Sequence, residues 1–459
     1  MVMLPDDVLK HRRVVVMGFG RQGQALARWL PTVGARVVVT DARPPDALGV
    51  DLRDFPRVEF VLGEHPFSLL DHADLLCVSG GVPLTAPLVE EAMRRRVGVT
   101  NDAQLFIERC PAPVIGITGS AGKTTTTSLV GAMLKRGGFT TWVGGNIGNV
   151  LLDVMMGIRP EHRVVMELSS FQLELMFASP RTSAVLNITP NHLDRHGTME
   201  NYMRAKANIV AHQPAGSQAI LGYDDPGARA LETLVSGDLL WFSRHDLVAD
   251  GAFMVGERLA VAGLASPDGE PHIVCSAADI PLRGEHNLLN VLAACAIAGS
   301  QGVEPEALAE AIREFTAVPH RLETVRELNG VTYVNDSIAT APERVVAALN
   351  SYAEPLVLLL GGRDKNLSWH EMLALALMKS RQIIAFGEAA ELVCRAAREV
   401  GASADAVQPV ATLAEAVTRA AEIARPGDVV LLSPGGTSYD AYVDFAARGD
   451  HFRQLVMAL

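Results

Sequence analysis

Three apolar runs that stop at glycine turns constrain the fold of this chain more than any other feature. Stretches rich in valine, isoleucine and leucine end in glycines at residues 14–20 (VVVMGFG), 114–123 (VIGITGSAGK) and 357–365 (VLLLGGRDK). Buried parallel strands have such continuous apolar runs because helices cover both faces of their sheet, and ligands gather at the strands' carboxyl ends. The runs therefore predict an α/β protein whose lobes each contain a strand followed by a glycine turn.

Turn-rich joints divide the 459 residues into three predicted domains. The chain is too long for one ordinary core, since a domain usually takes about 150 residues. One joint lies near Asn101 and another near Pro319. We predict a Rossmann-like domain over residues 1–101, a central domain with a mostly parallel, phosphate-loop ATPase-like sheet over residues 102–318, and a second Rossmann-like domain over residues 319–459.

The net charge and the cysteines of the chain indicate which classes of partner it binds and in which cellular compartment it works. The formal net charge of -12 would repel a nucleic-acid backbone, and the short cluster of arginines at 94–96 is most simply a solvated helix face. Five scattered cysteines without a Cys-x-x-Cys pair indicate neither a disulfide framework nor a zinc cluster. The longest nearly apolar stretch, residues 288–299, is too short to span a bilayer. We expect a monomeric cytoplasmic protein that binds neither nucleic acid nor membranes.

A glycine-rich loop at residues 119–124 connects a predicted strand (114–118) to a predicted helix (125–133). This arrangement aims several backbone N–H groups and the positive end of the helix dipole at one point, where an anion binds. Lys123 would reach the terminal phosphates of ATP, and the Thr124 hydroxyl would ligate Mg²⁺. The strict motif needs a glycine where this chain has Ile117, so the loop is a variant. A turn that binds nothing is the alternative, but a lysine followed by four threonines serves packing poorly.

Candidate metal ligands follow the loop. Glu167 ends an apolar run, which favours a Mg²⁺ role beside the loop, although an exposed carboxylate at a strand end is the alternative. His192 and His196 are four residues apart but lack the intervening glutamate of hydrolytic zinc helices, so their spacing does not favour zinc. A histidine ligand to a second Mg²⁺ and a helix cap are the two remaining interpretations.

The first glycine loop, GFGRQG at 18–23, has the spacing of a dinucleotide-binding turn, and Asp41 ends the next predicted strand. The same geometry holds any diphosphate attached to a ribose, including a UDP-sugar. An NAD-dependent oxidoreductase and a non-catalytic, nucleotide-regulated binding module are therefore alternatives. The second phosphate loop argues against hydride transfer, which needs no separate ATP site.

Several motifs together resemble the Mur ligase family along nearly the whole chain. They are the loop at 119–124, ELSSFQLE (167–174), NHLDRH (191–196), YMRAKANI (202–209), GEHNLLN (284–290), PHRLE (319–323) and NDS (335–337). The segments GFGRQG, GGNIG (144–148) and LLSPGGTSYDAYVDFAARGDHF (431–452) are similar to the family branch that adds D-glutamate to UDP-N-acetylmuramoyl-L-alanine in cytoplasmic peptidoglycan precursor synthesis. Ala121 and the absence of a D-N-P-R motif argue against the branches that add alanine and lysine or diaminopimelate.

The resemblance implies an ADP-forming ligase reaction. The γ-phosphoryl group of ATP would pass to the carboxylate of the bound L-alanine, and the glutamate amine would attack the acyl phosphate and release phosphate. The implied catalytic residues are Lys123, Glu167, His192 and Lys206. Two Mg²⁺ ions would be held by Thr124, Glu167, His192 and a carbamylated Lys206.

The resemblance also assigns residues to each substrate. ATP would contact Gly119, Ser120, Ala121, Gly122, Lys123, Thr124, Thr125, Asn290, Arg321 and Asp336. The UDP substrate would contact Gly20, Arg21, Gln22, Asp41, Arg43, Asn146, Ser169 and Gln172. The incoming glutamate would meet Lys365, Ser438 and Phe445.

One departure from the family pattern lies in the implied glutamate pocket. The family's N-D-S-K-A-T-N reads NDSIATA at 335–341, so Ile338 stands where a lysine ordinarily helps to fix a glutamate carboxylate. Either another cation substitutes or the amino-acid pocket differs. A branch of the same family that adds L-glutamate is therefore the alternative.

Overall fold

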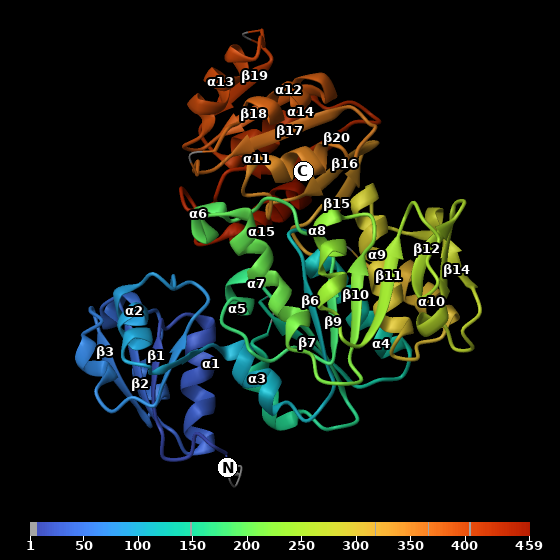
Figure 1. Ribbon diagram of the computed structural model, residues 1–459. Coiled ribbons are helices and arrows are strands. Elements are labelled where there is room, and N and C mark those ends of the chain that lie inside the picture. The colour runs from blue at the N-terminus through green and yellow to red at the C-terminus, as the bar shows by residue number, and fades with distance from the viewer. Residues whose placement is uncertain (1–6, 147–148, 317, 366, 404) are drawn as a thin grey trace. The chain divides into compact units, whose positions relative to one another are not determined.

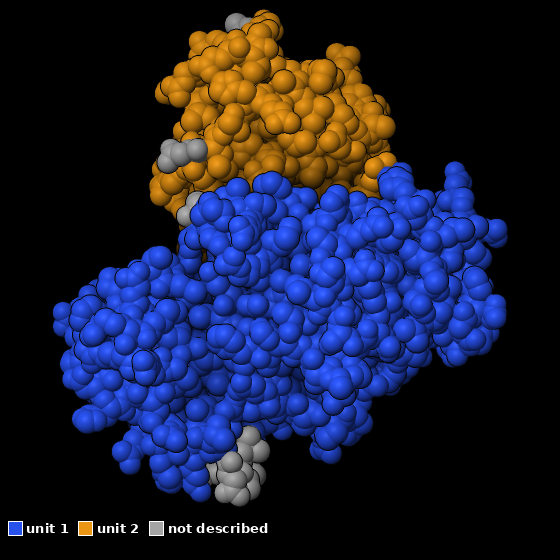
Figure 2. Space-filling view, in the orientation of Figure 1, with its two compact units in different colours: residues 1–279, 289–314 blue, residues 280–288, 315–459 orange. Residues whose placement is uncertain are grey.

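The computed structural model describes residues 7–146, 149–316, 318–365, 367–403 and 405–459. The chain forms three mostly parallel sheets with helices beside them, which confirms the predicted α/β class (Figure 1). Its contacts define two compact units, residues 1–279 with 289–314 and residues 280–288 with 315–459 (Figure 2). Each sheet falls within one of the three predicted domains, whose boundaries remain predictions.

The first sheet is five-stranded and wholly parallel, in the order β3-β2-β1-β4-β5. Its first strand is a run of valines that are fully buried, as expected for a strand covered on both faces. The strand order reverses between β1 and β4, and ligands bind at such a switch point. The elements are β1 (Arg13–Met17), α1 (Arg21–Trp29), β2 (Arg36–Asp41), β3 (Val58–Leu62), β4 (Leu75–Val78), α2 (Pro87–Arg94) and β5 (Gly98–Thr100).

The second sheet has nine strands in the order β14-β13-β12-β11-β10-β9-β6-β8-β7. It is parallel from β7 to β12 and ends in two antiparallel pairings. Its strands are β6 (Val114–Thr118), β7 (Thr141–Gly145), β8 (Arg163–Glu167), β9 (Thr182–Val185), β10 (Gln218–Gly222), β11 (Asp238–Ser243), β12 (Gly251–Val255), β13 (Arg258–Ala262) and β14 (His272–Ser276). The helices of this region are α3 (Asp102–Arg109), α4 (Lys123–Arg136), α5 (Ser170–Leu173), α6 (Leu193–His196), α7 (Met199–Ala211), α8 (Pro226–Arg229), α9 (Glu285–Gly299) and α10 (Pro305–Glu314).

The apolar residues at 184–188 predict a strand there, but the ninth strand is observed at Thr182–Val185. The Leu186 N–H still donates to the Thr118 carbonyl of β6 at 2.9 Å, but the residues after Leu186 bond outside the sheet. The Asn187 carbonyl accepts a hydrogen bond from the loop after β6, and the Ile188 N–H donates to the Asp225 side chain. The apolar pattern runs past the strand because Leu186 and Ile188 are still buried.

The third sheet has six strands in the order β15-β16-β20-β17-β18-β19, of which only the β15–β16 pair is antiparallel. The carboxyl ends of the adjacent strands β16, β20 and β17 therefore meet at one edge. The elements are β15 (Glu323–Leu328), β16 (Val331–Asn335), α11 (Pro342–Leu349), β17 (Leu356–Gly361), α12 (His370–Lys379), β18 (Ser380–Phe386), α13 (Ala390–Glu399), β19 (Val407–Val410), α14 (Leu413–Ile423), β20 (Val429–Gly435) and α15 (Phe445–Ala458). Across the described residues, no helix combines the length and the apolar character needed to cross a membrane.

Candidate active site

The phosphate loop lies between two neighbouring strands that each supply a side chain. Because β6 is flanked by β8 and β9, Glu167 and Asn187 come to lie on either side of the loop. The Asn187 carbonyl accepts from the Ser120 N–H at 2.9 Å, and its side-chain oxygen accepts from the Ala121 N–H at 2.8 Å. Asn187 thus holds the shape of the loop. It was absent from the sequence prediction, and its position at the end of a buried strand was the available signal.

Gly122 is required where the loop enters helix α4. Its φ of +82° lies in the left-handed region, and a Cβ atom there would come within 2.1 Å of the Asn290 side-chain oxygen. The helix begins at Lys123, so its positive dipole end points at the loop. Asn290, which belongs to the predicted ATP site, therefore lies directly beside the loop.

Two lysines converge on a carbonyl of the loop. The Lys123 ammonium donates to the Gly119 carbonyl at 2.7 Å, and the Lys206 ammonium donates to the same carbonyl at 2.9 Å. Lys206 also donates to the Thr118 hydroxyl at 3.1 Å and is only 1% exposed. Burial lowers the pKa of Lys206 well below its usual range, and the charge of Lys123 lowers it further, against the opposing effect of Glu167. Lys123 therefore places a cation where phosphates are predicted to bind, whereas burial disfavours the charged form of Lys206.

Glu167 is a buried carboxylate whose contacts suit a hard cation. It is 1% exposed, and its two oxygens accept from neutral groups, the Thr124 hydroxyl and the Asn146 amide, each at 2.9 Å. A buried carboxylate is costly unless a cation or strong donors meet its charge. Mg²⁺ prefers carboxylate and other oxygen ligands. Thr124 and Glu167, which the sequence predicted as metal ligands, are thus brought together in an arrangement that fits Mg²⁺.

The two histidines of the NHLDRH motif lie around Phe171. The His192 ring is 5.1 Å from the Phe171 ring, centroid to centroid, and His192 caps helix α6 with a φ of +53°. His196 is buried, stacks on Phe171 at 5.2 Å and shares a 3.0 Å hydrogen bond with the Ser170 hydroxyl. In the described part of the chain, no three histidine, cysteine or acidic side chains group as a metal site. Because it is buried and stacked on Phe171, His196 is the histidine of the two that has a packing role.

A cavity of about 380 Å³ lies at the switch point of the first sheet and extends to the end of β7. Six of the eight residues predicted for the UDP substrate line it, namely Gly20, Arg21, Gln22, Asp41, Asn146 and Ser169. Gln172 is instead buried in a capping box with Ser169 at the start of α5, so it orients a lining residue. Two residues of the predicted GGNIG segment, Ile147 and Gly148, lie outside the described residues.

The glycine loop at this cavity is held by Asp41. The carboxylate accepts from the Phe19 N–H at 2.7 Å and from the Arg43 guanidinium at 2.9 Å through both oxygens. The Arg43 hydrogen bonds lower the pKa of Asp41 to about 2, although its burial opposes this shift. A Cβ atom on Gly23 would come within 1.9 Å of the Gly18 carbonyl oxygen, so the turn can be this tight only with glycine. Asp41 is thus ionised, and its carboxylate holds the glycine loop through the Phe19 N–H.

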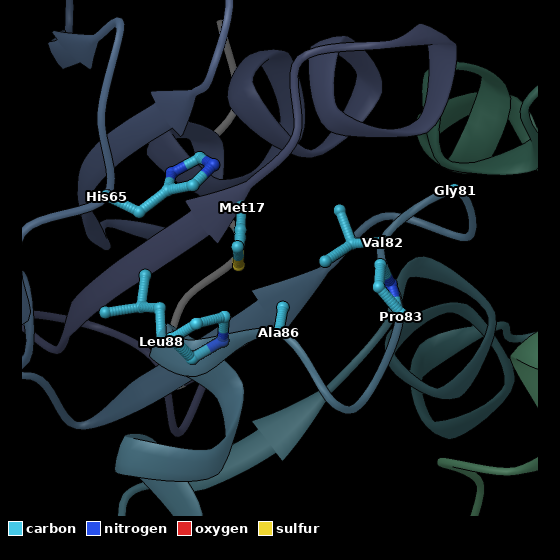
Figure 3. A pocket seen from close by; sticks show the side chains of 8 residues that line it. Met17, His65, Gly81, Val82, Pro83, Ala86 and Leu88 are labelled. Atoms are coloured by element: carbon cyan, nitrogen blue, oxygen red, sulfur yellow. The ribbon is translucent and has the colours of Figure 1, made fainter.

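A second, largely apolar cavity of about 370 Å³ adjoins the first and shares Gly81 and Val82 with it. Figure 3 shows His65 and Leu88 on one side of this cavity, Val82 and Pro83 on the other, and Met17 between them. His65 shares a 2.8 Å hydrogen bond with the Thr40 hydroxyl at the end of β2. Both cavities therefore open at the carboxyl edge of the first sheet.

The second compact unit gathers the remaining predicted residues at the carboxyl edge of its own sheet. Asp336 follows β16, and its oxygens accept from the Ser433 hydroxyl at 2.8 Å and the Leu322 N–H at 3.3 Å. Burial raises the pKa of Asp336 to about 7, while the Ser433 hydrogen bond and the charge of Arg321 oppose the rise. The predicted glutamate residues lie on adjoining loops, where Lys365 follows β17, Ser438 follows β20 and Phe445 begins α15.

The fold and the site together define a nucleotide-dependent α/β enzyme. A phosphate loop, a buried carboxylate on the adjacent strand and a switch-point cavity in the same compact unit are the parts that phosphoryl transfer needs. Two glycine turns, each between a strand and a helix, distinguish the chain from a protein with a single dinucleotide-binding turn.

Comparison with known proteins identifies the family. Models of the MurD-like N-terminal domain, the Mur ligase middle domain and the Mur ligase glutamate ligase domain match residues 12–101, 117–298 and 320–436. The UDP-N-acetylmuramoylalanine--D-glutamate ligase of Pelotomaculum thermopropionicum is 41% identical over 100% of this chain and 99% of that protein. The ligase of the same name from Symbiobacterium thermophilum is 40% identical over 98% of each chain.

Two solved structures show the same fold. UDP-N-acetylmuramate-alanine ligase MurC from Thermotoga maritima has a TM-score of 0.60 at 19% identity and covers 98% of this chain and 100% of its own. MurF from Acinetobacter baumannii has a TM-score of 0.58 at 20% identity, with coverages of 98% and 91%. The chain belongs to the Mur ligase family, and it is an ATP-dependent ligase.

Proposed function

We propose that this chain joins D-glutamate to UDP-N-acetylmuramoyl-L-alanine in peptidoglycan precursor synthesis and converts ATP to ADP and phosphate. The observation that carries the proposal is the position of Asn146. Its amide donates to Glu167 beside the phosphate loop, and the same residue lines the switch-point cavity. A UDP-linked acceptor in that cavity can thus present its carboxylate to the γ-phosphate. The names of the relatives that match over the full length support this choice of substrate.

The residues of the chain supply binding, orientation and charge. The loop from Gly119 to Thr124 and the start of α4 would hold the phosphates of ATP, and Lys123 would neutralise the charge that spreads over the transferring oxygens. Arg21 and Gln22 would hold the diphosphate of the acceptor at the glycine turn. The glutamate amine then attacks the acyl phosphate formed on L-alanine. The C–N bond forms, the nitrogen loses a proton to solvent, and phosphate leaves with the C–O electron pair.

Mg²⁺ would supply further charge neutralisation to the phosphates when bound. We assign one ion to Thr124 and Glu167 and a second to His192 and Lys206. Lys206 fits this role as a carbamate. Its amine is buried beside the loop, and a carbamate there would present the anionic oxygen that a hard metal ion prefers. We further propose that the chain acts as a monomer in the cytoplasm.

We expect Lys206→Ala to lower the rate of phosphate release by about a hundredfold, because one oxygen ligand and its charge are lost. In wild-type protein, removal of bicarbonate and carbon dioxide should lower the rate, and their return should restore it. Lys206→Ala should show no response to bicarbonate. Lys135→Ala, an exposed lysine at the end of α4, is the matched control. Unchanged activity of Lys206→Ala in bicarbonate-depleted buffer would remove this role.

Phosphate release tests the proposed function directly. We expect release only when ATP, Mg²⁺, UDP-N-acetylmuramoyl-L-alanine and D-glutamate are all present, with L-glutamate at least about tenfold less effective. A preference for L-glutamate would assign the chain to the L-glutamate-adding branch instead. Nucleotide binding without phosphate release would favour a binding module, and quenching of NADH fluorescence would favour an oxidoreductase.

A further inference from the structure

The loop after β16 lacks the cation that its motif ordinarily carries. Ile338 stands at that position, half-buried, between Asp336 and Thr340. The carboxyl end of β20 lies next to this loop, and the carboxyl end of β17 lies one strand further along, since the order of the sheet is β16-β20-β17. Neighbouring elements of the same unit can supply the positive charge that an anionic substrate needs.

Arg344, in the first turns of helix α11, provides such a charge. Its guanidinium donates to the Ile338 carbonyl at 3.3 Å, so it lies over the very residue that replaces the family lysine. The side chain is exposed, and no carboxylate in the described part of the chain lies within ion-pair distance of it. Arg363, by contrast, is held by Glu388 at 2.8 Å. Arg344 is thus held near the loop by this contact, and its charge also opposes the rise that burial causes in the pKa of Asp336.

A second cation approaches the same loop from the end of β17. The Lys365 ammonium donates to the Thr340 hydroxyl at 3.3 Å. Lys365 and Arg344 therefore both contact the short segment 338–340, one through a side chain and one through a carbonyl. Glutamate has two carboxylates, and two cations at one loop match that charge pattern.

Another nearby arginine has a different role. Arg448 is fully buried, and its guanidinium donates to the Ser337 hydroxyl, the Ser337 carbonyl and the Gly436 carbonyl at 2.9–3.1 Å. These bonds hold the loop after β16 to the loop after β20. Arg448 therefore shapes the pocket from within the core, which leaves Arg344 as the exposed arginine in hydrogen-bond contact with Ile338.

We propose that Arg344 replaces the missing lysine and binds one carboxylate of the incoming glutamate, with Lys365 binding at the same loop. The inference rests on the proposed ligase function and makes Arg344 a determinant of amino-acid specificity. A guanidinium can hold a carboxylate through two parallel hydrogen bonds, which a point charge such as lysine cannot do. The chain would thus bind a dicarboxylic amino acid without the family's lysine.

Steady-state kinetics of the full chain test this inference. We expect Arg344→Gln to raise the KM for glutamate about tenfold or more, because a charge-assisted hydrogen bond is lost. The KM values for ATP and the UDP substrate should change less than about twofold, and the melting temperature should be unchanged. Arg344→Lys should recover part of the loss. Arg398→Ala, an exposed helical arginine that donates to the Cys394 carbonyl, should behave as wild type.

A relocated charge provides the sharper test. Adding Ile338→Lys to Arg344→Gln returns a cation to the loop and should lower the KM for glutamate again. An unchanged glutamate KM in Arg344→Gln, or an equal rise in all three KM values, overturns the inference. Absence of any phosphate release by the wild type would contradict the proposed function instead. In that case, calorimetric titration with glutamate tests the inference without turnover. Equal affinity of the wild type and Arg344→Gln for glutamate overturns the inference, and so does the absence of binding by the wild type.

Discussion

Lys123→Ala should abolish nearly all phosphate release, with a fall in kcat of about a thousandfold, similar to the loss of other preorganised charge-stabilising groups. The lysine begins helix α4, and its ammonium is held over the loop by the Gly119 carbonyl at 2.7 Å. In phosphoryl transfer, negative charge spreads over the transferring oxygens, and there is little covalent chemistry for the protein to perform. A cation fixed at this point therefore acts mainly on the transition state.

The measurement is phosphate release under saturating substrates, with the affinity for ATP determined separately by titration. Lys135→Ala is the matched control because it removes an exposed lysine from the other end of the same helix. We expect the ATP affinity of Lys123→Ala to fall far less than its kcat, since the loop N–H groups and the helix dipole remain. A kcat within about threefold of wild type would show that the charge of Lys123 has no part in the reaction.

The strands and turns around the site follow from local patterns in the sequence. The runs ending at Gly18 and Gly119 are continuous and apolar, and each becomes a fully buried parallel strand followed by a glycine turn and a helix. The residues that follow the joint near Pro319 also predict a strand at 331–335, and β16 is observed with the same bounds. Local patterns suffice here because burial on both faces of a parallel sheet leaves a strong apolar signature.

Contacts that depend on strand order could not be predicted in this way. Asn187 holds the phosphate loop only because β9 is the neighbour of β6, and no local pattern contains that adjacency. The same holds for Asn146, whose contact with Glu167 requires β7 to lie next to β8. The contact of Arg344 with the Ile338 carbonyl likewise depends on the fold, because it forms only when the residues after Ala341 are in helix α11.

Burial also separates roles that the sequence leaves equivalent. His192 and His196 occur in one short motif, yet His196 is buried against Phe171 and Ser170 while His192 is exposed at the helix cap. Lys123 and Lys206 both donate to the Gly119 carbonyl, but Lys206 is almost completely buried and its pKa is strongly lowered. The spacing of residues along the chain does not indicate such differences in burial, and for Lys206 burial decides how readily the ammonium gives up a proton.

Glu167→Gln should lower kcat by about a hundredfold to a thousandfold and raise the Mg²⁺ concentration needed for half-maximal activity about tenfold. The substitution keeps the size of the side chain but removes a buried negative charge. The Glu167 oxygens accept from Thr124 and Asn146 at 2.9 Å, and an amide can accept at only one of its two ends. Both the proposed metal ligation and the contact that links the loop to the cavity are therefore weakened.

Glu161→Gln is the control, since this exposed glutamate precedes the opposite end of the same strand, β8. Magnesium titrations of the wild type and both variants, at fixed saturating ATP, separate a metal effect from a general loss of activity. A melting temperature within a few degrees of wild type would show that the Glu167→Gln site remains folded. If excess Mg²⁺ restores part of the rate of Glu167→Gln, Glu167 acts through the ion. If Glu167→Gln has the same Mg²⁺ requirement and the same rate as the wild type, Glu167 is instead only a structural partner of Thr124.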